Sequence, residues 1–212
     1  MSLFTRWMAR RHGGMAALYE KFTRPMEEAG LAAVRAALAA DLSGRILELG
    51  CGTGLNFAHY PATAEVVALE PLDEFRVFAA ARASTVAARI TVVEGDAQAL
   101  PFADHSFDAA LETLVFCSVP DAPRGLRELR RVLRPGAPLR CFEHVRSPER
   151  IGAAMQDLFN PLWRWMMDGC NVNRDTVAAI GAAGFTIEQV RVHDLRVPRA
   201  PRFPMREIHA RA

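Results

Sequence analysis

Three glycines in alternation, Gly50, Gly52 and Gly54, follow directly on the short apolar segment 46–49. Glycine lacks a Cβ atom, so a bound molecule can come close to its backbone, and it adopts positive φ angles without strain. In open α/β sheets, ligands bind beyond the carboxyl ends of the strands. The spacing therefore predicts a loop that holds a nucleotide-type ligand against bare peptide groups at the end of a strand.

Two classes of cofactor use such a loop, and the position of the third glycine distinguishes them. A dinucleotide fingerprint, G-x-G-x-x-G, would place that glycine at position 55, where this chain has Leu55. Glu70 ends the next apolar segment, and its carboxylate can accept hydrogen bonds from two ribose hydroxyls. Asp96 follows the third apolar segment, within the sequence EGDAQALPF. The pattern favours a nucleoside cofactor that is not a dinucleotide.

The glycine spacing, Glu70 and the segment 94–102 together resemble the class I S-adenosylmethionine-dependent methyltransferases. The resemblance implies an enzyme that binds S-adenosylmethionine and releases S-adenosylhomocysteine. It also implies cofactor contacts from an N-terminal helix, from the glycine loop and from the ends of the following strands. The implied cofactor-binding residues are Tyr19, Glu48, Gly50, Cys51, Gly52, Gly54, Asn56, Glu70, Pro71, Phe75, Asp96, Ala97, Thr113 and Leu114.

Structural roles remain open for several of these residues. Glu48 could instead form an ion pair within the sheet, and Asp96 could cap a helix. Four of the other residues could simply pack in the core without touching a cofactor: Tyr19, Phe75, Thr113 and Leu114.

Three further segments resemble a narrower group, the methyltransferase-like seven proteins of animals and their bacterial relatives. The segments are ETLVFCSVPD (112–121), FEHVRSP (142–148) and NPLWRWMMDGCNVNRDTVAAIGAAGF (160–185), which contains the tetrapeptide D-G-C-N. The resemblance covers roughly residues 44–187. It implies methyl transfer to a small-molecule thiol, which in bacterial relatives includes dithiol natural products. The animal proteins carry an apolar N-terminal anchor that we do not find here, so membrane attachment is not implied.

His144 is the candidate general base, and Glu143 is its neighbour at the end of the fifth predicted strand. Imidazole titrates near neutral pH and can accept the proton of the acceptor. A free thiol has a pKa of about 8.5, so some thiolate forms without help and a base assists without being indispensable. A purely structural hydrogen bond between the two side chains is the alternative.

The acceptor is expected next to the D-G-C-N segment. The candidate acceptor-binding residues are Trp163, Met167, Asp168 and Asn171. Trp163 and Met167, with Trp165 and Met166, would form an apolar lid, with ordinary core packing as the alternative. Asp168 and Asn171 could instead cap a helix that begins near residue 173.

The four cysteines, Cys51, Cys117, Cys141 and Cys170, form neither a CxxC pair nor a zinc-finger spacing. We therefore predict no metal site. Cys117 and Cys170 are not needed as nucleophiles, because direct methyl transfer forms no covalent enzyme intermediate. Free cysteines fit a reducing compartment, and we predict a cytoplasmic location.

An alternation of strand and helix patterns must position these residues. Strand patterns occur at 45–50, 65–70, 89–96, 107–116 and 139–145, and helical patterns at 29–42, 53–60, 73–88 and 122–137. Such alternation is typical of a parallel sheet with helices on both faces. Two helical stretches, 149–167 and 173–182, and two alternating strands, 185–195 and 206–212, complete the chain.

We predict an α/β fold with a doubly wound, mostly parallel seven-stranded sheet and an antiparallel C-terminal hairpin at its edge. The single domain would comprise an N-terminal helical cap (1–43), a cofactor-binding core (44–145), and a part with acceptor-side helices and the terminal hairpin (146–212).

The bulk composition excludes some other classes of protein. The net charge of +2 is too small to indicate a nucleic-acid partner, and 50% hydrophobic residues suffice for a large core. No uncharged apolar run approaches the roughly 18 residues of a membrane span, and the start of the chain lacks the apolar part of a signal peptide. Methylation of nitrogen, oxygen or carbon on a lipid headgroup or quinone, or cofactor binding without catalysis, remains open, as does the oligomeric state.

Overall fold

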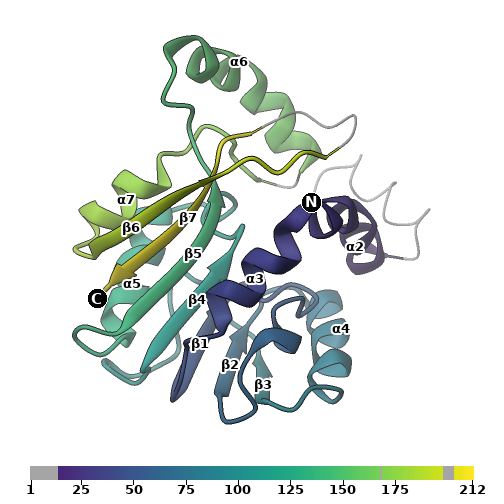
Figure 1. Ribbon diagram of the computed structural model, residues 1–212, viewed down its shortest axis with the longest axis vertical. Coiled ribbons are helices and arrows are strands. Elements are labelled where there is room, and N and C mark those ends of the chain that lie inside the picture. Colours follow the sequence, from purple (N-terminus) through teal and green to yellow (C-terminus); the bar gives the residue numbers. More distant parts are fainter. Residues whose placement is uncertain (1–13, 168, 198–202) are drawn as a thin grey trace.

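The computed structural model describes residues 14–167, 169–197 and 203–212, and a seven-stranded sheet runs through this part of the chain (Figure 1). Its strand order is β3-β2-β1-β4-β5-β7-β6. The parallel strands are β1 (Arg45–Leu49), β2 (Glu65–Leu69), β3 (Arg89–Val93), β4 (Ala109–Thr113) and β5 (Pro138–His144). β7 (Met205–Arg211) is antiparallel to both of its neighbours, β5 and β6 (Thr186–His193). The predicted sheet with its antiparallel C-terminal hairpin is confirmed.

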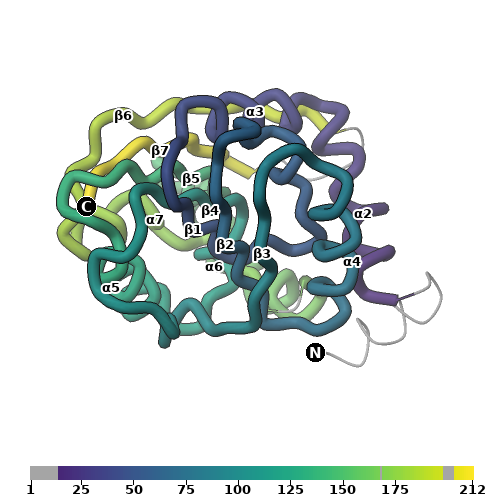
Figure 2. The backbone as a smooth tube through the Cα atoms, turned by 90° about the horizontal axis from the view of Figure 1, so that it is seen from below, coloured from purple at the N-terminus to yellow at the C-terminus, as the bar shows by residue number. Residues whose placement is uncertain are grey.

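Helices cover both faces of the sheet. They are α2 (Met15–Met26), α3 (Ala32–Ala39), α4 (Asp73–Ala83), α5 (Ala122–Val132), α6 (Arg150–Met166), α7 (Thr176–Ala182), a π-helix η1 (Glu27–Leu31) and a 3-10 turn η2 (Phe57–His59). Leu47 of β1 belongs to a core cluster that includes residues of α5 and α7, and Ile46 to a second cluster with residues of α3 and α4. Figure 2 shows α3 and α5 on opposite sides of the strands. Because both faces are buried, the central strands are nearly continuous apolar runs.

The N-terminal helices lie against the cofactor half of the sheet. α2 contacts α4, where Glu74 accepts a hydrogen bond from the backbone N–H of Ala16 (3.1 Å) and Arg82 pairs with Glu20 (2.7 Å). The chain turns between α2 and α3 at Gly30, whose φ is 123°. α6 extends away from the sheet at the opposite end of the molecule from β3 (Figure 1). The predicted division of the domain into an N-terminal cap (1–43), a cofactor-binding core (44–145) and an acceptor-side part (146–212) stays a prediction.

Several predicted helices differ from the structure: α4 ends at Ala83 instead of residue 88, and three others differ for a clear local reason. The helix expected over 53–60 is wrong, because Gly54 has a left-handed φ of 83° and only the 3-10 turn η2 follows. The helix expected near residue 173 begins at Thr176, where the Asp175 side chain accepts the N–H of Ala178 (3.0 Å). α5 ends at Val132 instead of residue 137, because Leu133 is already extended.

Candidate active site

The glycine loop follows β1, and its three glycines serve different purposes. All three have left-handed backbones, with φ of 61° at Gly50, 56° at Gly52 and 83° at Gly54. A Cβ atom on Gly50 would lie 2.7 Å from Val115 Cγ2, and one on Gly54 would lie 2.6 Å from Phe57 Cδ2. The chain's own packing therefore requires these two glycines, whatever the ligand.

Gly52 is the open member of the loop. A Cβ atom there would make only ordinary contacts, 3.8 Å from Tyr19 Cε1 and 3.9 Å from Phe75 Cδ1. Tyr19 of α2 and Phe75 of α4 stand over this glycine, with ring centroids 5.4 Å apart in an edge-to-face arrangement. The structure thus brings together two predicted cofactor-binding rings and the one glycine whose bare face a ligand could use.

Glu70 fixes the shape of this loop. Its carboxylate accepts hydrogen bonds from the backbone N–H groups of Gly52 and Leu72, each at 3.0 Å. Burial raises the pKa of Glu70, although these two N–H donors and Arg76 act in the opposite direction. A carboxylate offers about four lone-pair sites, so Glu70 keeps acceptor capacity for ligand hydroxyls. The adjoining Pro71 stays a predicted cofactor residue.

Cys51 holds the loop to the sheet through its backbone. Its N–H donates to the carbonyl oxygen of Leu69 (3.1 Å), and its thiol is buried. Burial raises the pKa of this thiol, which keeps it neutral. A thiolate role for Cys51 is therefore disfavoured, and its backbone is the part available to a cofactor.

The turn after β3 presents Asp96 at the surface. Its carboxylate accepts the N–H of Gln98 (2.8 Å) and is exposed. The alternative of a helix cap is wrong, because residues 96–101 form a turn and a bridge in the structure and no helix begins there. Ala97 is buried in the core cluster of the α5 face. Contacts of Asp96 and Ala97 with adenine stay predictions.

A buried polar network lies beneath the glycine loop. Glu48 is fully buried and accepts hydrogen bonds from Asn56 Nδ2 (3.0 Å) and the Tyr60 hydroxyl (2.8 Å). Asn56 also contacts the Thr113 hydroxyl (3.3 Å) and accepts from Arg35 Nη1 (2.9 Å). Burial raises the pKa of Glu48 to about 7. Glu48 therefore has hydrogen-bond partners instead of the ion pair within the sheet that was the alternative. Contact of Glu48 and Asn56 with the cofactor stays a prediction.

Arg35 is a residue of this network that the sequence analysis missed. It is 3% exposed, lies on α3, and pairs with Glu27 of η1 at 3.0 Å. A charged residue within the otherwise apolar helical pattern 29–42 was the available signal, because a buried arginine needs partners. Arg35 links the N-terminal helices to the base of the glycine loop.

The loop after β4 is held by a pair of buried glutamates. Glu143 Oε1 accepts the N–H groups of Val115 (2.7 Å) and Phe116 (2.6 Å). Glu112 Oε2 also lies 3.3 Å from the Val115 N–H, and burial and the neighbouring Glu143 raise the pKa of Glu112. Leu114, between strand and loop, has a φ of 61°, an unusual angle for a residue with a side chain, and Thr113 is buried beside it. Glu143 thus positions this loop.

His144 does not pair with Glu143, so the structural alternative of a hydrogen bond between them is wrong. Successive strand residues point to opposite faces of a sheet, and the two side chains have separate partners. His144 Nε2 lies 3.1 Å from Cys170 Sγ, and no partner is present for its buried Nδ1 in the described residues. Together with Cys117, these side chains place two sulfurs and an imidazole nitrogen within 4.8 Å of one another. The sequence did not reveal this cluster, because its members are far apart in the chain.

The segment after α6 closes over Cys117. Asn171 Nδ2 donates to the carbonyl oxygens of Cys117 and Gly169, both at 2.9 Å. Asn171 therefore orders the loops here, and the alternative of capping α7 is wrong for it, since Asp175 performs that role. Asp168 lies outside the described residues.

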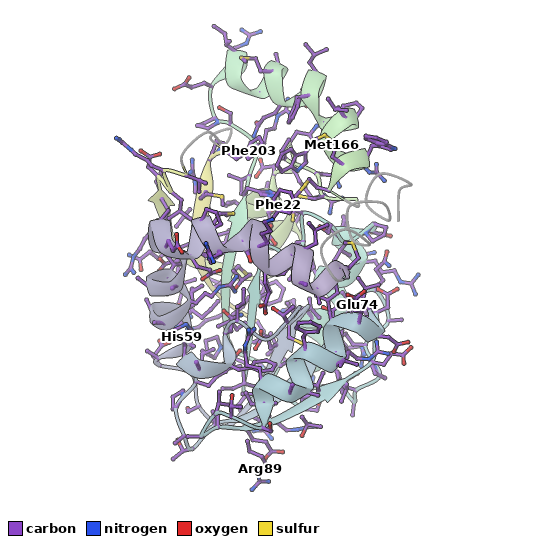
Figure 3. All side chains as sticks on the ribbon, turned by 90° about the vertical axis from the view of Figure 1, so that its right-hand side faces the viewer. Phe22, His59, Glu74, Arg89, Met166 and Phe203 are labelled. Atoms are coloured by element: carbon purple, nitrogen blue, oxygen red, sulfur yellow. The ribbon has the colours of Figure 1, made fainter. Side chains whose placement is uncertain are left out.

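Trp163 and Met167 lie at the same end of the molecule. Trp163 Nε1 donates to Cys170 Sγ (3.4 Å), and its ring packs on Phe203 with centroids 4.9 Å apart. Met167 is 38% exposed. Figure 3 shows Met166 and Phe203 above α2, toward α6. This arrangement matches an apolar wall next to the His–Cys cluster, and acceptor binding by these residues stays a prediction. Two shallow surface hollows, at Arg146–Asp157 and beside Phe78, contain none of the predicted site residues.

Comparison with known proteins identifies the family. Residues 47–141 match the model of a methyltransferase domain. Over 180 residues, the chain is 37% identical to "Thiol S-methyltransferase TMT1B" of Homo sapiens, a match that covers 81% of this chain and 73% of that protein. The chain belongs to the class I S-adenosylmethionine-dependent methyltransferases. The family resemblance predicted from the glycine loop, Glu70 and the D-G-C-N segment is thereby confirmed.

Two further matches of this methyltransferase show how far the similarity extends. The "Ubiquinone/menaquinone biosynthesis C-methyltransferase UbiE" of Dinoroseobacter shibae is 36% identical over 128 residues, which are 58% of this chain and 51% of that protein. A crystal structure of a putative methyltransferase from Bacillus halodurans superposes with a TM-score of 0.72 at 16% identity, covering 85% of this chain and 97% of that one. At that identity the superposition shows the shared fold.

The residues of the loop fit the family's methyl donor. S-adenosylmethionine contains a nucleoside that can lie against Gly52, and Glu70 can accept hydrogen bonds from the hydroxyls of its ribose. Tyr19 and Phe75 lie next to Gly52 and pack edge to face on each other, so both rings could contact the bound nucleoside. Among the described residues, no helix is both long enough and apolar enough to cross a bilayer. The cytoplasmic location stays a prediction.

Proposed function

We propose that this methyltransferase transfers the sulfonium methyl group of S-adenosylmethionine to the sulfur of a small-molecule thiol. The observation that carries the proposal is the 37% identity to a human thiol S-methyltransferase over 180 residues. That match extends over 81% of the chain, beyond the cofactor half. Dithiol natural products are the finer candidate acceptors, as the resemblance to bacterial relatives implies.

Each part of the site has a task in this reaction. Bound S-adenosylmethionine supplies an activated methyl group on a positively charged sulfur. The Gly52 face and Glu70 would hold it at the ends of β1 and β2. The donor loses its charge as the methyl group leaves, so apolar surroundings such as Trp163 and Phe203 favour the transition state over the charged ground state.

Holding the acceptor sulfur in line with the methyl group on the donor sulfur supplies much of the remaining rate acceleration. Glu143 anchors the loop at Val115 and Phe116 through two short hydrogen bonds, and this loop lies against Gly50. In the absence of a metal ion, His144 at the end of β5 would accept the proton of the acceptor thiol. We infer that Glu143 positions this loop, and the catalytic roles of His144 and Glu143 stay predictions.

A panel of acceptors tests the proposal directly. The purified protein is incubated with S-adenosylmethionine and with aliphatic thiols, aromatic thiols, dithiols and the alcohol analogue of each, and methylated products are measured by mass spectrometry. We expect methylation of thiols and none of the matched alcohols. A protein that binds S-adenosylmethionine but methylates no thiol contradicts the proposal.

Methylation of a quinone carbon is the second candidate, because the UbiE protein is 36% identical over 128 residues. That match covers 58% of this chain, against 81% for the human thiol S-methyltransferase, so it is the weaker support of the two. A demethylated quinol added to the same panel distinguishes the two functions. Cofactor binding without any turnover would indicate a non-catalytic role.

A further inference from the structure

Three side-chain atoms that could bind a metal ion, two sulfurs and one imidazole nitrogen, meet near the carboxyl ends of β4 and β5. Cys117 comes from the loop after β4, His144 from the end of β5, and Cys170 from the segment after α6. Their two sulfurs and one ring nitrogen all lie within 4.8 Å of one another, and all three side chains are buried. Two cysteines and a histidine are a common set of zinc ligands. Magnesium and calcium prefer oxygen ligands, so this site favours zinc over either of them.

The surroundings hold these ligands in place. Asn171 binds the Cys117 carbonyl oxygen with both its backbone N–H (2.8 Å) and its side chain (2.9 Å). Trp163 Nε1 donates to the Cys170 sulfur (3.4 Å), and Glu143 fixes the backbone just before Cys117. Hydrogen bonds around the ligands orient them and adjust the affinity of a metal site. The cluster is therefore built by several elements and does not depend on one mobile side chain.

The position of the cluster relates it to the methyl donor. Parallel strands β1, β4 and β5 end at the same edge of the sheet, and Val115, two residues before Cys117, fills the space left by the missing side chain of Gly50. The donor loop and the cluster are thus neighbours. Three protein ligands leave the fourth position of a tetrahedral zinc site for an outside molecule, as in catalytic zinc sites.

We propose that Cys117, His144 and Cys170 bind a Zn²⁺ ion whose fourth ligand is the sulfur of the acceptor thiol. The inference rests on the proposed function for the identity of that fourth ligand. Binding to zinc releases the thiol proton to water, because a coordinated thiol is deprotonated. A lone pair of the bound sulfur then forms the new S–CH3 bond. The bond from the methyl carbon to the donor sulfonium breaks, and its electron pair stays on the donor sulfur. Both products are neutral thioethers, so the methylated acceptor is a weaker ligand and leaves.

Metal binding is tested without any turnover. The full-length protein, reduced with a phosphine and freed of metal, is titrated with Zn²⁺ in competition with a chromophoric chelator. We expect one strong site, weakened at least about tenfold by Cys117→Ser or by Cys170→Ser. Cys141→Ala is the matched control, because Cys141 is also buried but lies within β5 outside the cluster. Thermal unfolding of each apo variant checks that it is folded.

Cobalt substitution reports the ligands themselves. We expect sulfur-to-cobalt charge-transfer absorption that loses about half its intensity in either single Cys→Ser variant and is unchanged in Cys141→Ala, since two sulfurs bind the ion. Addition of an acceptor thiol, but not of its alcohol analogue, should change this spectrum. Absence of a strong site in the reduced protein, or equal zinc binding by the Cys117→Ser/Cys170→Ser double variant, overturns the proposal.

The outcomes separate this inference from the proposed function. If cobalt spectra show thiol binding but no thiol is methylated, the proposed function fails and the metal site stands. If chelator-treated protein methylates thiols at the same rate as zinc-loaded protein, the role of zinc fails and the proposed function stands.

Discussion

Gly52 and Gly54 have similar left-handed backbones, but their surroundings separate ligand binding from folding. The space beside Gly52 is bounded by two aromatic rings at ordinary contact distance, whereas Gly54 is in contact with Phe57. The same substitution at the two positions therefore has different consequences. Gly136 offers a control for strain alone, because its φ is 77° and nothing lies within 4 Å of the Cβ position.

We predict that Gly52→Ala and Gly136→Ala lower the free energy of unfolding by similar amounts, roughly 1–2 kcal/mol, the cost of a left-handed alanine. Only Gly52→Ala should weaken S-adenosylmethionine binding, by about tenfold or more, because its methyl group occupies the face used by the ligand. Gly54→Ala should cost roughly 1–3 kcal/mol more in stability through overpacking against Phe57. Denaturant unfolding and calorimetric titration measure the two effects. Unchanged affinity of Gly52→Ala would remove Gly52 from the site.

Glu70 is the second residue whose loss should affect the cofactor. We predict that Glu70→Ala weakens S-adenosylmethionine binding by about 1.5–3 kcal/mol, the scale of hydrogen bonds to a charged group. The variant also releases the N–H of Gly52, which Glu70 holds at 3.0 Å. Glu65→Ala removes a carboxylate from the exposed start of β2, the strand that Glu70 follows, and should leave the dissociation constant unchanged. Calorimetry on both variants is the measurement, and equal affinities would refute the role of Glu70.

Glu48 gives a pH dependence whose sign follows from its raised pKa of about 7. The unfolded chain has an ordinary glutamate pKa of about 4.3, so between these values the folded state binds the extra proton. Stability from this group is therefore full below about pH 4 and falls as pH rises to about 7, by up to roughly 4 kcal/mol. In Glu48→Gln this part of the slope should be absent. Unfolding free energies of both proteins from pH 5 to 8 measure it, and parallel curves would contradict the prediction.

At this scale the sequence predicted where the site residues gather, but not what each one contacts. The glycine spacing located the loop, yet Val115 and Phe57 explain two of its three glycines, and both contacts are tertiary. His144 lies at the end of β5, as predicted, whereas its partner Cys170 comes from the segment that follows α6. Such partners depend on how loops pack, which no local pattern records.

Among the elements, the β6–β7 hairpin has a buried charge at its centre. Glu207 of β7 accepts hydrogen bonds from His193 and His209, each at 2.8 Å, and pairs with Arg191 at 3.0 Å. Burial acts to raise the pKa of Glu207, but these partners lower it overall. The carboxylate thus contributes stability above its unfolded pKa, and this contribution is lost as pH falls through the folded pKa.

We predict that Glu207→Gln lowers the free energy of unfolding by about 1–3 kcal/mol at pH 7, because buried donors lose a charged acceptor. The difference from the wild-type protein should shrink as pH falls below about 4. Glu188→Gln is the matched control in β6, since its ion pair with Arg211 is exposed and such pairs contribute about 1 kcal/mol or less. Denaturant unfolding at several pH values tests both. An equal loss in the two variants would show that burial of Glu207 is unimportant.

Strand and helix patterns predicted most elements, although several helix ends differ, and the one predicted α-helix that does not form lies in the glycine loop. The strands alternate with helices as expected, because burial on two faces leaves a strong apolar pattern. Residues 53–60 also had a helical pattern, but Gly54 and the following Pro61 leave room for only the turn at Phe57. Backbone conformation at one glycine outweighed the periodicity of its neighbours.

For the whole molecule, the order of strands makes β7 indispensable. It pairs with β5 from Pro138 to His144 on one side and with β6 on the other, and Ile208 and Ala210 are completely buried. We predict that a chain ending at residue 203 does not fold cooperatively, because β6 loses its only partner strand and β5 loses one of its two. Near-ultraviolet circular dichroism and thermal unfolding measure this, with the full chain as control. A cooperative transition in the shortened chain would contradict the prediction.

The same strand order has a consequence during synthesis. β5 leaves the ribosome well before β7, so one row of its peptide groups stays open while α6, α7 and β6 are still being made. An open strand edge is a template for pairing with other chains. The nascent protein is therefore most prone to aggregation in this interval, and holdase chaperones that recognise extended segments should protect it most until β7 is released.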